Sequence, residues 1–285
     1  MNPKPLDTEK AKRNAALEAV KHVKDGFIVG LGSGSSAAIA IEEIGKRMRS
    51  QKIRVLGVPT SYQAFILAVQ HGIPTTTLEE HPLLDVTIDG ADQIDKQLNL
   101  IKGMGGALTR EKIVAYSSKQ NIIVADESKK VRILGENGHP VPIEVLPLAV
   151  PLVMRKLKTL KGKPVLREGK GKVGPVVTDN GNVILDSEFG LIQKPAELAC
   201  DLKMIPGVVE TGIFVGTANV VYVGKSSTVE KLMKGRVFPF SNQTHLLFEQ
   251  CLETCLVIAA LRFAVGIFDD DSIFRIEGMP AFVTS

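Results

Sequence analysis

The sequence predicts an α/β fold with a mostly parallel sheet and a second, smaller α+β unit. Three observations support this prediction: a length of 285 residues, short apolar runs that alternate with helical stretches, and glycine-rich turns after several of those runs. A usual size of about 150 residues per domain gives a first estimate of two domains. A hydrophobic content of 44% is enough for a sizeable core, so global disorder is excluded.

The first half of the chain alternates between predicted strands and helices. We expect a first helix capped by Asp7 or Thr8, with apolar positions near Leu17, Val20 and Val23 at helical spacing. Strands are then predicted at 27–31, 53–58, 85–89 and 121–125. Helices are predicted at about 37–48, at 61–71, and after the loop at 102–106, through Glu111 to about residue 118. Strands that alternate with helices favour a parallel sheet covered on both faces.

The order of predicted elements changes near Gly135. Strands are predicted at 141–146, 165–167, 183–185 and 208–214, and helices at 148–158 and about 195–202. This order is typical of a ferredoxin-like unit, after which 220–223 would return to the first sheet. We therefore expect a Rossmann-like domain of residues 1–135 plus about 216–232 and a small ferredoxin-like domain of residues 136–215. An extension of unknown structure would cover residues 233–285.

Charge and cysteine content limit the partners that we expect. Lys and Arg number 35 against 31 for Asp and Glu, with both signs interspersed, so no nucleic-acid partner is predicted, whereas a small anionic substrate fits. The polar start of the chain is unlike a secretory signal, and the longest apolar run, 255–268, contains Arg262 and is too short to span a membrane. Three cysteines form no disulfide or metal-binding pattern. We expect a cytoplasmic protein with no membrane partner.

The first candidate ligand-binding loop, Gly30 to Ser36, follows the first predicted strand. Loops at the carboxyl ends of parallel strands form the ligand crevice of an open α/β sheet. Here glycines allow a close backbone approach, and N–H groups at the start of the next helix attract phosphate. The loop has neither the Gly-Lys-Ser/Thr ending of a nucleotide P-loop nor regular dinucleotide spacing, and a glycine-rich turn after a strand is also a common structural need.

Three further loops supply charged residues. Asp89 and Asp92 follow the third strand, Lys102 precedes a loop rich in glycine, and Glu111 begins the helix after it, while Lys129 follows another buried strand. Each residue alone has a structural explanation as a turn former, a solvated lysine or a helix-stabilising glutamate. Together, without a metal-binding cluster, they favour proton transfer next to a carbonyl on a phosphorylated substrate.

The same segments resemble the ribose-5-phosphate isomerase family, type A. The resemblance rests on the motifs at 29–36, 89–92, 100–112, 125–129, 174–182 and 205–212, which occur in the family's order and cover roughly residues 10–232. It implies that D-ribose 5-phosphate and D-ribulose 5-phosphate are interconverted through an enediol intermediate without a cofactor, in the non-oxidative pentose phosphate pathway. It also implies a homodimer or homotetramer.

The resemblance assigns roles to individual residues. Glu111 falls on the family's general base, Asp89 would assist ring opening, and Lys102 would stabilise the enediolate oxygen. The serine loop and Lys129 would hold the phosphate, and no metal ligand is expected. The matched substrate-binding residues are Ser33, Gly34, Ser35, Ser36, Asp89, Gly90, Ala91, Asp92, Lys102, Gly103, Met104, Gly105 and Lys129.

Three substitutions depart from the family pattern. Met104 replaces a glycine and would strain the loop if its φ were positive. Serines replace threonines in the first loop, which keeps the hydroxyl groups, and Gln93 replaces a glutamate. Residues beyond about Lys234 have no counterpart in the family, and a truncated chain that ends there is expected to remain active.

Two other functions fit the same fold class. A non-catalytic sugar-phosphate sensor is one, but such modules usually follow a DNA-binding helix-turn-helix, which is not evident before Gly30. A sugar-phosphate deaminase or CoA-transferase on a related fold is the other, although residues 102–112 resemble the isomerase more closely. Fold kinship alone does not decide between these functions.

Overall fold

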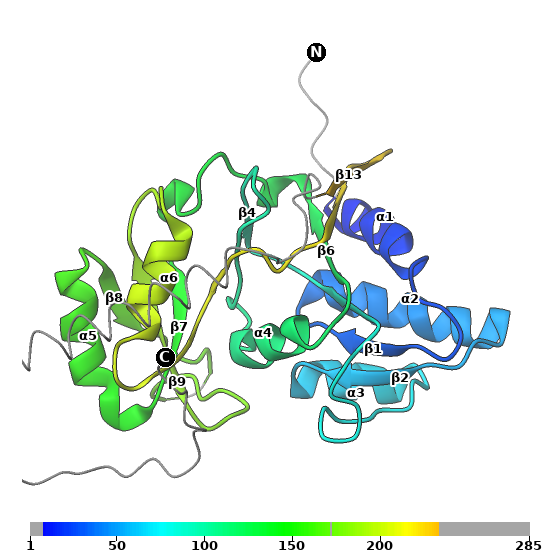
Figure 1. The fold of residues 1–285 in the computed structure, drawn as a ribbon, viewed down its shortest axis with the longest axis horizontal. Helices are drawn as coiled ribbons and strands as arrows, with labels where there is room; N and C mark the ends of the chain where they lie inside the picture. Colours follow the sequence, from blue (N-terminus) through cyan, green and yellow to red (C-terminus); the bar gives the residue numbers. More distant parts are fainter. Residues whose placement is uncertain (1–7, 172, 234–285) are drawn as a thin grey trace, which may run out of the picture. The chain divides into compact units, whose positions relative to one another are not determined.

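The computed structural model describes residues 8–171 and 173–233 (Figure 1). Its contacts group the chain up to Gly235 into one compact unit, which contains all the elements described below. The extension expected from residue 233 onward, with Cys251 and Cys255, lies outside the described residues except for residue 233 itself.

The main sheet has six strands in the order β13-β12-β6-β3-β1-β2. Its strands are β1 (Ile28–Leu31), β2 (Leu56–Pro59), β3 (Val86–Asp89), β6 (Asn121–Asp126), β12 (Val220–Gly224) and β13 (Val229–Met233). All neighbouring pairs are parallel except β12 and β13, which pair antiparallel. The predicted parallel sheet and the return of 220–223 to it are therefore confirmed.

Three helices share one hydrophobic cluster with one face of this sheet: α1 (Thr8–Val20), α2 (Ser35–Gln51) and α3 (Tyr62–Gln70). Strand residues alternate between faces, so Ile122 and Val124 of β6 join this cluster while Ile123 points to the opposite face. Of the apolar positions noted in the sequence, Val20 and Val23 are buried, whereas Leu17 is 41% exposed, because α1 packs through its alanines and Val20. Small alanine side chains allow α1 to approach the sheet closely.

The opposite face is covered by α4 (Leu108–Tyr116) and by a small three-stranded sheet. That sheet has the order β11-β5-β4 and consists of β4 (Gln93–Ile94), β5 (Leu100–Ile101) and β11 (Ile213–Phe214). Phe214 of β11 is fully buried. Of these short strands, β4 and β5 are not predicted from the sequence, because two residues are too few to give a periodic pattern.

A separate sheet follows the predicted ferredoxin-like order. Its strands are antiparallel in the order β10-β7-β9-β8, with β7 (Val141–Val145), β8 (Lys163–Leu166), β9 (Val183–Glu188) and β10 (Val208–Thr211). The helices α5 (Val150–Thr159) and α6 (Pro195–Lys203) supply Val153, Leu157 and Leu202 to its core. This fold class is confirmed, whereas the exact division of the chain into domains stays a prediction.

Several predicted strands have different limits in the structure, and two of the differences affect the fold. The second strand begins at Leu56 instead of residue 53. The strand expected at 208–214 is two strands, β10 and β11, in two different sheets. Gly212 separates them, because its N–H donates to Pro142 O while its carbonyl accepts from Lys102 N, and a Cβ at this position would lie 2.3 Å from Lys102 O.

The strand order determines where a ligand can bind. β1 lies between β2 and β3. The next strand along the chain, β2, pairs with one edge of β1, and the following strand, β3, pairs with the other edge. In open α/β sheets, a crevice forms outside the carboxyl ends of the strands at such a reversal. The loops after β1, β3 and β6 meet there.

Candidate active site

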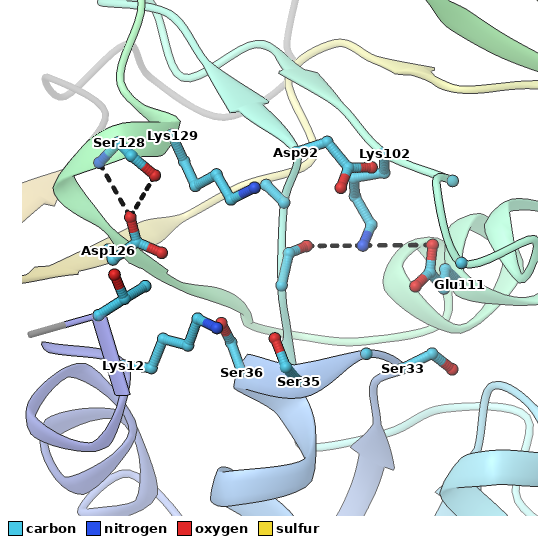
Figure 2. Close-up of a pocket in the computed structure, with 16 residues that line it drawn as sticks. Lys12, Ser33, Ser35, Ser36, Asp92, Lys102, Glu111, Asp126, Ser128 and Lys129 are labelled. Atoms are coloured by element: carbon cyan, nitrogen blue, oxygen red, sulfur yellow. Dashed lines mark hydrogen bonds and ion pairs between the residues drawn. The ribbon is translucent and has the colours of Figure 1, made fainter. Parts of the chain in front are cut away.

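A cavity of about 220 Å³ lies at the carboxyl ends of β1, β3 and β6 (Figure 2). It is smaller than the roughly 300–1,000 Å³ of sites for drug-sized ligands, which suits a small metabolite. Its lining residues are Thr8, Lys12, Ser33, Gly34, Ser35, Ser36, Gly90, Ala91, Asp92, Lys102, Gly103, Gly105, Glu111, Asp126, Ser128 and Lys129.

The loop after β1 brings the start of α2 to the cavity. The helix begins at Ser35, and its N-cap, Gly34, has φ of 90° and no side chain to occupy the exposed N–H groups. These N–H groups and the partial positive charge of the helix terminus favour an anion. The Ser33 hydroxyl instead donates to Ser61 Oγ at 2.6 Å and lies 2.8 Å from Thr60 Oγ1, which anchors the loop.

A buried cluster of three charges lies at the other end of the cavity. Lys102 Nζ is 3.1 Å from Asp89 Oδ2 and 3.2 Å from Glu111 Oε2, and it donates to the Gly90 carbonyl at 2.6 Å. The three side chains are no more than 6% exposed. Asp89 Oδ2 and Glu111 Oε2 contact the ammonium group as ion pairs but accept no hydrogen bond. One lysine therefore neutralises two carboxylates only in part.

This imbalance changes the proton affinity of the cluster. Burial, with the neighbouring charge of Asp89, raises the pKa of Glu111 to about 8, although Lys102 opposes the shift. Burial alone lowers the pKa of Lys102, but the charges of Asp89 and Glu111 outweigh it and raise that pKa above its usual range. The surroundings therefore favour the charged form of Lys102 and hold the proton of Glu111 more strongly than that of an ordinary glutamate, a pattern common at functional sites.

The two aspartates after β3 have different surroundings. Asp89 Oδ1 accepts from the N–H groups of Ser33 at 3.0 Å and Gly90 at 2.7 Å, and its side chain does not line the cavity. Gly32 is required beneath it, because a Cβ there would lie 2.2 Å from Asp89 Oδ1. Asp92 lines the cavity, and its Oδ2 accepts from Met104 N at 3.0 Å.

The expected strain at Met104 is wrong. The positive φ angles of this loop belong to Gly103 (108°) and Gly106 (82°), and Met104 is not in the left-handed region. Its side chain is 44% exposed and does not line the cavity. Gln93, the other noted departure, is buried and bridges to the chain at 135–136, donating to Glu136 O and accepting from Gly135 N.

The structure adds cavity residues that the sequence analysis did not identify: Thr8, Lys12, Asp126 and Ser128. Asp126 accepts from Ser128 N at 2.9 Å and thereby caps the 3-10 turn η1 (Glu127–Lys129), which ends in the predicted Lys129. Lys12 comes from α1, and Figure 2 shows its end beside Ser36, while Lys129 extends into the pocket from the opposite side. Lys12 gives no sequence signal, because only the packing of α1 against β6 brings it to the site.

The described part of the chain has no group of three or more His, Cys, Asp or Glu side chains placed to hold a metal ion. None of its helices is long and apolar enough to cross a membrane. Cys200 is an exposed free thiol.

Fold and site together define an α/β protein whose cavity lies between a helix N-terminus and a buried cluster of one lysine and two carboxylates, and comparison with known proteins specifies its family. The family described as ribose 5-phosphate isomerase A (phosphoriboisomerase A) matches residues 56–228. The ribose-5-phosphate isomerase A of Methanosarcina acetivorans is 50% identical over 222 residues, which cover 78% of this chain and 93% of the relative. This chain belongs to the ribose 5-phosphate isomerase A family.

Solved structures agree with this membership. The ribose 5-phosphate isomerase A of Methanocaldococcus jannaschii superposes with a TM-score of 0.76 at 47% identity, covering 79% of this chain and 99% of that one. A D-ribose-5-phosphate isomerase in complex with phospho-erythronic acid gives a TM-score of 0.78 at 44% identity, with coverage of 80% and 99%.

Proposed function

We propose that this protein interconverts D-ribose 5-phosphate and D-ribulose 5-phosphate, a step of the non-oxidative pentose phosphate pathway. The observation that carries the proposal is the buried Lys102–Glu111 pair at one end of a cavity whose other end holds serines and lysines. A phosphate bound near the serines would direct the carbonyl end of a five-carbon chain toward Glu111. The names of the relatives and the phospho-erythronic acid complex support this substrate.

In this proposal Glu111 transfers the proton between the two carbons. Its carboxylate removes the proton from C2 of the open-chain aldose, and the electron pair of the broken C–H bond forms the C1=C2 bond of the enediolate while charge moves to O1. Return of the proton to C1, with transfer of the O2 proton to O1, gives the ketose. One carboxylate can perform both transfers when it lies over both carbons.

Lys102 would stabilise the enediolate. Its ammonium group is fixed by two carboxylates and one carbonyl, so it needs no reorganisation when negative charge develops on the substrate oxygen. Its raised pKa supports this role, because the group stays charged throughout the reaction. When Glu111 takes up the C2 proton it loses its negative charge, so the charge that develops on O1 would replace that of Glu111 beside Lys102.

The two aspartates would have different roles, Asp89 in ring opening and Asp92 in substrate binding. Asp89 was expected to assist ring opening; its contacts with Lys102 and the Ser33 N–H support an indirect action through those groups. Asp92 lines the cavity and is the carboxylate that would contact the sugar hydroxyl groups. Gly90, Ala91, Gly103 and Gly105 would supply backbone contacts from the same two loops.

The phosphate would bind at the start of α2. Ser35 and Ser36 offer hydroxyl and N–H groups there, and Lys12 and Lys129 add positive charge from α1 and η1. This combination of helix terminus and lysines is typical of phosphate sites. Ser33 and Gly34 support the loop, because Gly34 N donates to Gln63 Oε1 at 2.9 Å.

The proposal includes four further statements. The reaction needs no cofactor or metal ion; the protein is cytoplasmic; it binds neither nucleic acid nor membranes; and it forms a homodimer or homotetramer. Apolar side chains exposed on α3, such as Tyr62 (65%) and Val69 (60%), support self-association. Light scattering of the purified protein would measure the oligomeric state.

An assay of ribulose 5-phosphate formed from ribose 5-phosphate, with and without EDTA, tests the proposed function. We expect turnover that EDTA leaves unchanged. A folded protein without turnover would contradict the isomerase proposal, and loss of activity in EDTA would contradict the cofactor-free mechanism.

A further inference from the structure

The ferredoxin-like sheet reaches the proposed active site through one arginine. Arg167 directly follows β8, and its guanidinium group is only 12% exposed. Nε and Nη2 donate to the two carboxylate oxygens of Asp186 on β9, at 2.7 and 2.5 Å. Nη1 points to the glycine loop, where it donates to Gly103 O at 2.9 Å and Met104 O at 3.0 Å.

These contacts fix two peptide planes of a loop that has no regular structure. The C=O and N–H of a trans peptide point in opposite directions. The peptide between Gly103 and Met104 is held on both sides, its carbonyl by Arg167 and its N–H by Asp92 Oδ2. The next peptide has its carbonyl on Arg167, so the N–H of Gly105, a cavity-lining residue, is directed away from Arg167.

Without such a restraint this loop would be the least ordered part of the site. It connects β5 to α4 through three glycines in four residues, and glycine loses more conformational freedom on ordering than any other residue. The loop also carries Lys102 at its start and ends one turn before Glu111. Its conformation therefore determines where the charged groups and backbone donors lie relative to the substrate.

We propose that Arg167, oriented by Asp186, is a positioning residue for the reaction: it fixes the glycine loop so that Lys102 and the Gly105 N–H are preorganised for the enediolate. This inference rests on the proposed isomerase function. The planar fork of arginine suits the task, because one edge binds a carboxylate while the remaining nitrogen binds both carbonyls. Lysine has one nitrogen and cannot reproduce these contacts.

The experiment compares Arg167→Met and Arg167→Lys with the wild-type protein. A small displacement of catalytic groups lowers rates by up to about 10²-fold, so we expect kcat to fall about 10- to 100-fold in both variants while KM changes much less. Arg132→Met is the matched control, because Arg132 forms an ion pair with Glu136 but is 85% exposed. It should retain wild-type kcat.

Two inhibitors distinguish positioning from a general loss of structure. Phospho-erythronic acid has a carboxylate where the enediolate oxygens would lie, whereas inorganic phosphate needs only the serines and lysines at the other end. We expect Arg167→Met to weaken inhibition by phospho-erythronic acid about ten-fold and to leave inhibition by phosphate unchanged. Equal weakening of both inhibitors, or unchanged kcat in a folded variant, would overturn the proposal.

A second variant and a second measurement keep the test decisive. If Arg167→Met does not fold, Asp186→Asn is the second variant, because it removes the orienting charge at nearly constant volume. It should show the same selective loss of kcat. Wild-type kcat in Asp186→Asn would overturn the proposal. Hydrogen exchange at Met104 and Gly106, whose N–H groups donate to Asp92 Oδ2 and Gly103 O, should become faster in either variant, and unchanged exchange would contradict the positioning role. Absence of turnover in the wild-type protein would instead contradict the proposed function.

Discussion

Glu111 combines burial, a raised pKa and a carboxylate oxygen without a hydrogen bond, which are the properties expected of a general base. The first turn of α4 places it next to Lys102, so the charged form is neutralised only through a cation that Asp89 also uses. A surface glutamate at the same helical position would merely interact with the helix dipole. Burial beside a second carboxylate is what gives Glu111 a proton affinity suited to catalysis near neutral pH.

Replacing Glu111 with glutamine should abolish most of the activity. We expect Glu111→Gln to lower kcat by at least about 10²-fold, the lower end for loss of a general base, because the amide cannot accept the proton. KM should change much less, since the proposed phosphate contacts come from other loops. Steady-state kinetics measure both constants.

The stability of the same variant is the control. Glutamine has nearly the shape of the protonated acid that predominates below the raised pKa, so the free energy of unfolding should change by no more than about 1 kcal/mol. A folded Glu111→Gln protein that keeps more than about a tenth of wild-type kcat, equivalent to about 1.4 kcal/mol of barrier, would exclude Glu111 as the base. Asp92 would then be the next carboxylate to test.

The raised pKa of Glu111 predicts a pH dependence of activity. Only the ionised carboxylate accepts a proton, so kcat/KM should rise with pH and level off above the free-enzyme pKa of about 8. Measured kcat/KM between pH 6 and pH 10 gives the midpoint. The residual activity of Glu111→Gln should lack this step; the same step in the variant would mean that another group titrates.

The structure gives no reason to expect that Met104 hinders the reaction. Its φ is not positive and its side chain is 44% exposed outside the cavity lining, so Met104→Gly relieves no strain. We expect kcat and KM to stay within about two-fold of wild type, with a loss of stability of about 0.5–1 kcal/mol from the added glycine. Kinetics and urea unfolding measure the two effects. A clear gain in kcat would restore the earlier interpretation of a strained loop.

At the scale of elements, the first turn of α4 is held by the ferredoxin-like sheet through Glu144. This residue of β7 is fully buried, and its carboxylate accepts from Thr109 Oγ1 at 2.6 Å on α4. It also accepts from Thr178, Asn180 and Asn182 in the turn before β9. All four partners are donors, so the ionised carboxylate satisfies every contact and links that turn to the helix that carries Glu111.

Removing this acceptor should destabilise the protein. Thr109, Thr178 and Asn182 are buried, and each buried donor without a partner costs about 1–3 kcal/mol, so Glu144→Ala should lower the free energy of unfolding by at least about 2 kcal/mol. Glu144→Gln keeps one acceptor oxygen and should cost less. Urea unfolding of the two variants gives both values. Equal losses in alanine and glutamine would show that volume, and not hydrogen bonding, determines the effect.

Elements with a clear local pattern were predicted well from the sequence. The continuous apolar run of β6 and the capping Ser61 before α3, whose hydroxyl accepts from Ala64 N, are local signals. The three-stranded sheet was not predicted, because β5 pairs with β11, more than a hundred residues away in the chain, and two-residue strands have no periodicity. The break at Gly212 also depends on distant partners.

At the scale of the whole molecule, the sheet order converts separate loops into one site. β1, β3 and β6 are adjacent, so Ser35, Asp92 and Lys129 meet although nearly a hundred residues separate the first from the last. These loops are predictable from their position after strands and from family resemblance. Lys12 is not, because a helix that packs across the sheet brings residues together without any spacing pattern, and no sequence pattern indicates that Arg167 contacts the glycine loop.

The cavity lining among the described residues leads to a prediction for the whole chain. In that part of the chain, every cavity-lining residue lies between Thr8 and Lys129, and the last described strand, β13, ends at Met233. The solved Methanocaldococcus jannaschii relative is covered over 99% of its length by only 79% of this chain. The elements matched in that relative therefore suffice for its fold.

We expect a protein that stops after Lys234 to be soluble and to retain kcat and KM within about two-fold of the full chain, because no lining residue is lost and surface changes away from a site have small effects. Steady-state kinetics of both proteins, with a urea unfolding curve for each, make the comparison. A truncated protein that unfolds like the full chain but has no turnover would show that residues beyond 234 complete the site. An insoluble truncated protein would instead assign those residues a packing role, since β13 is an edge strand whose outer side has no partner among the described strands.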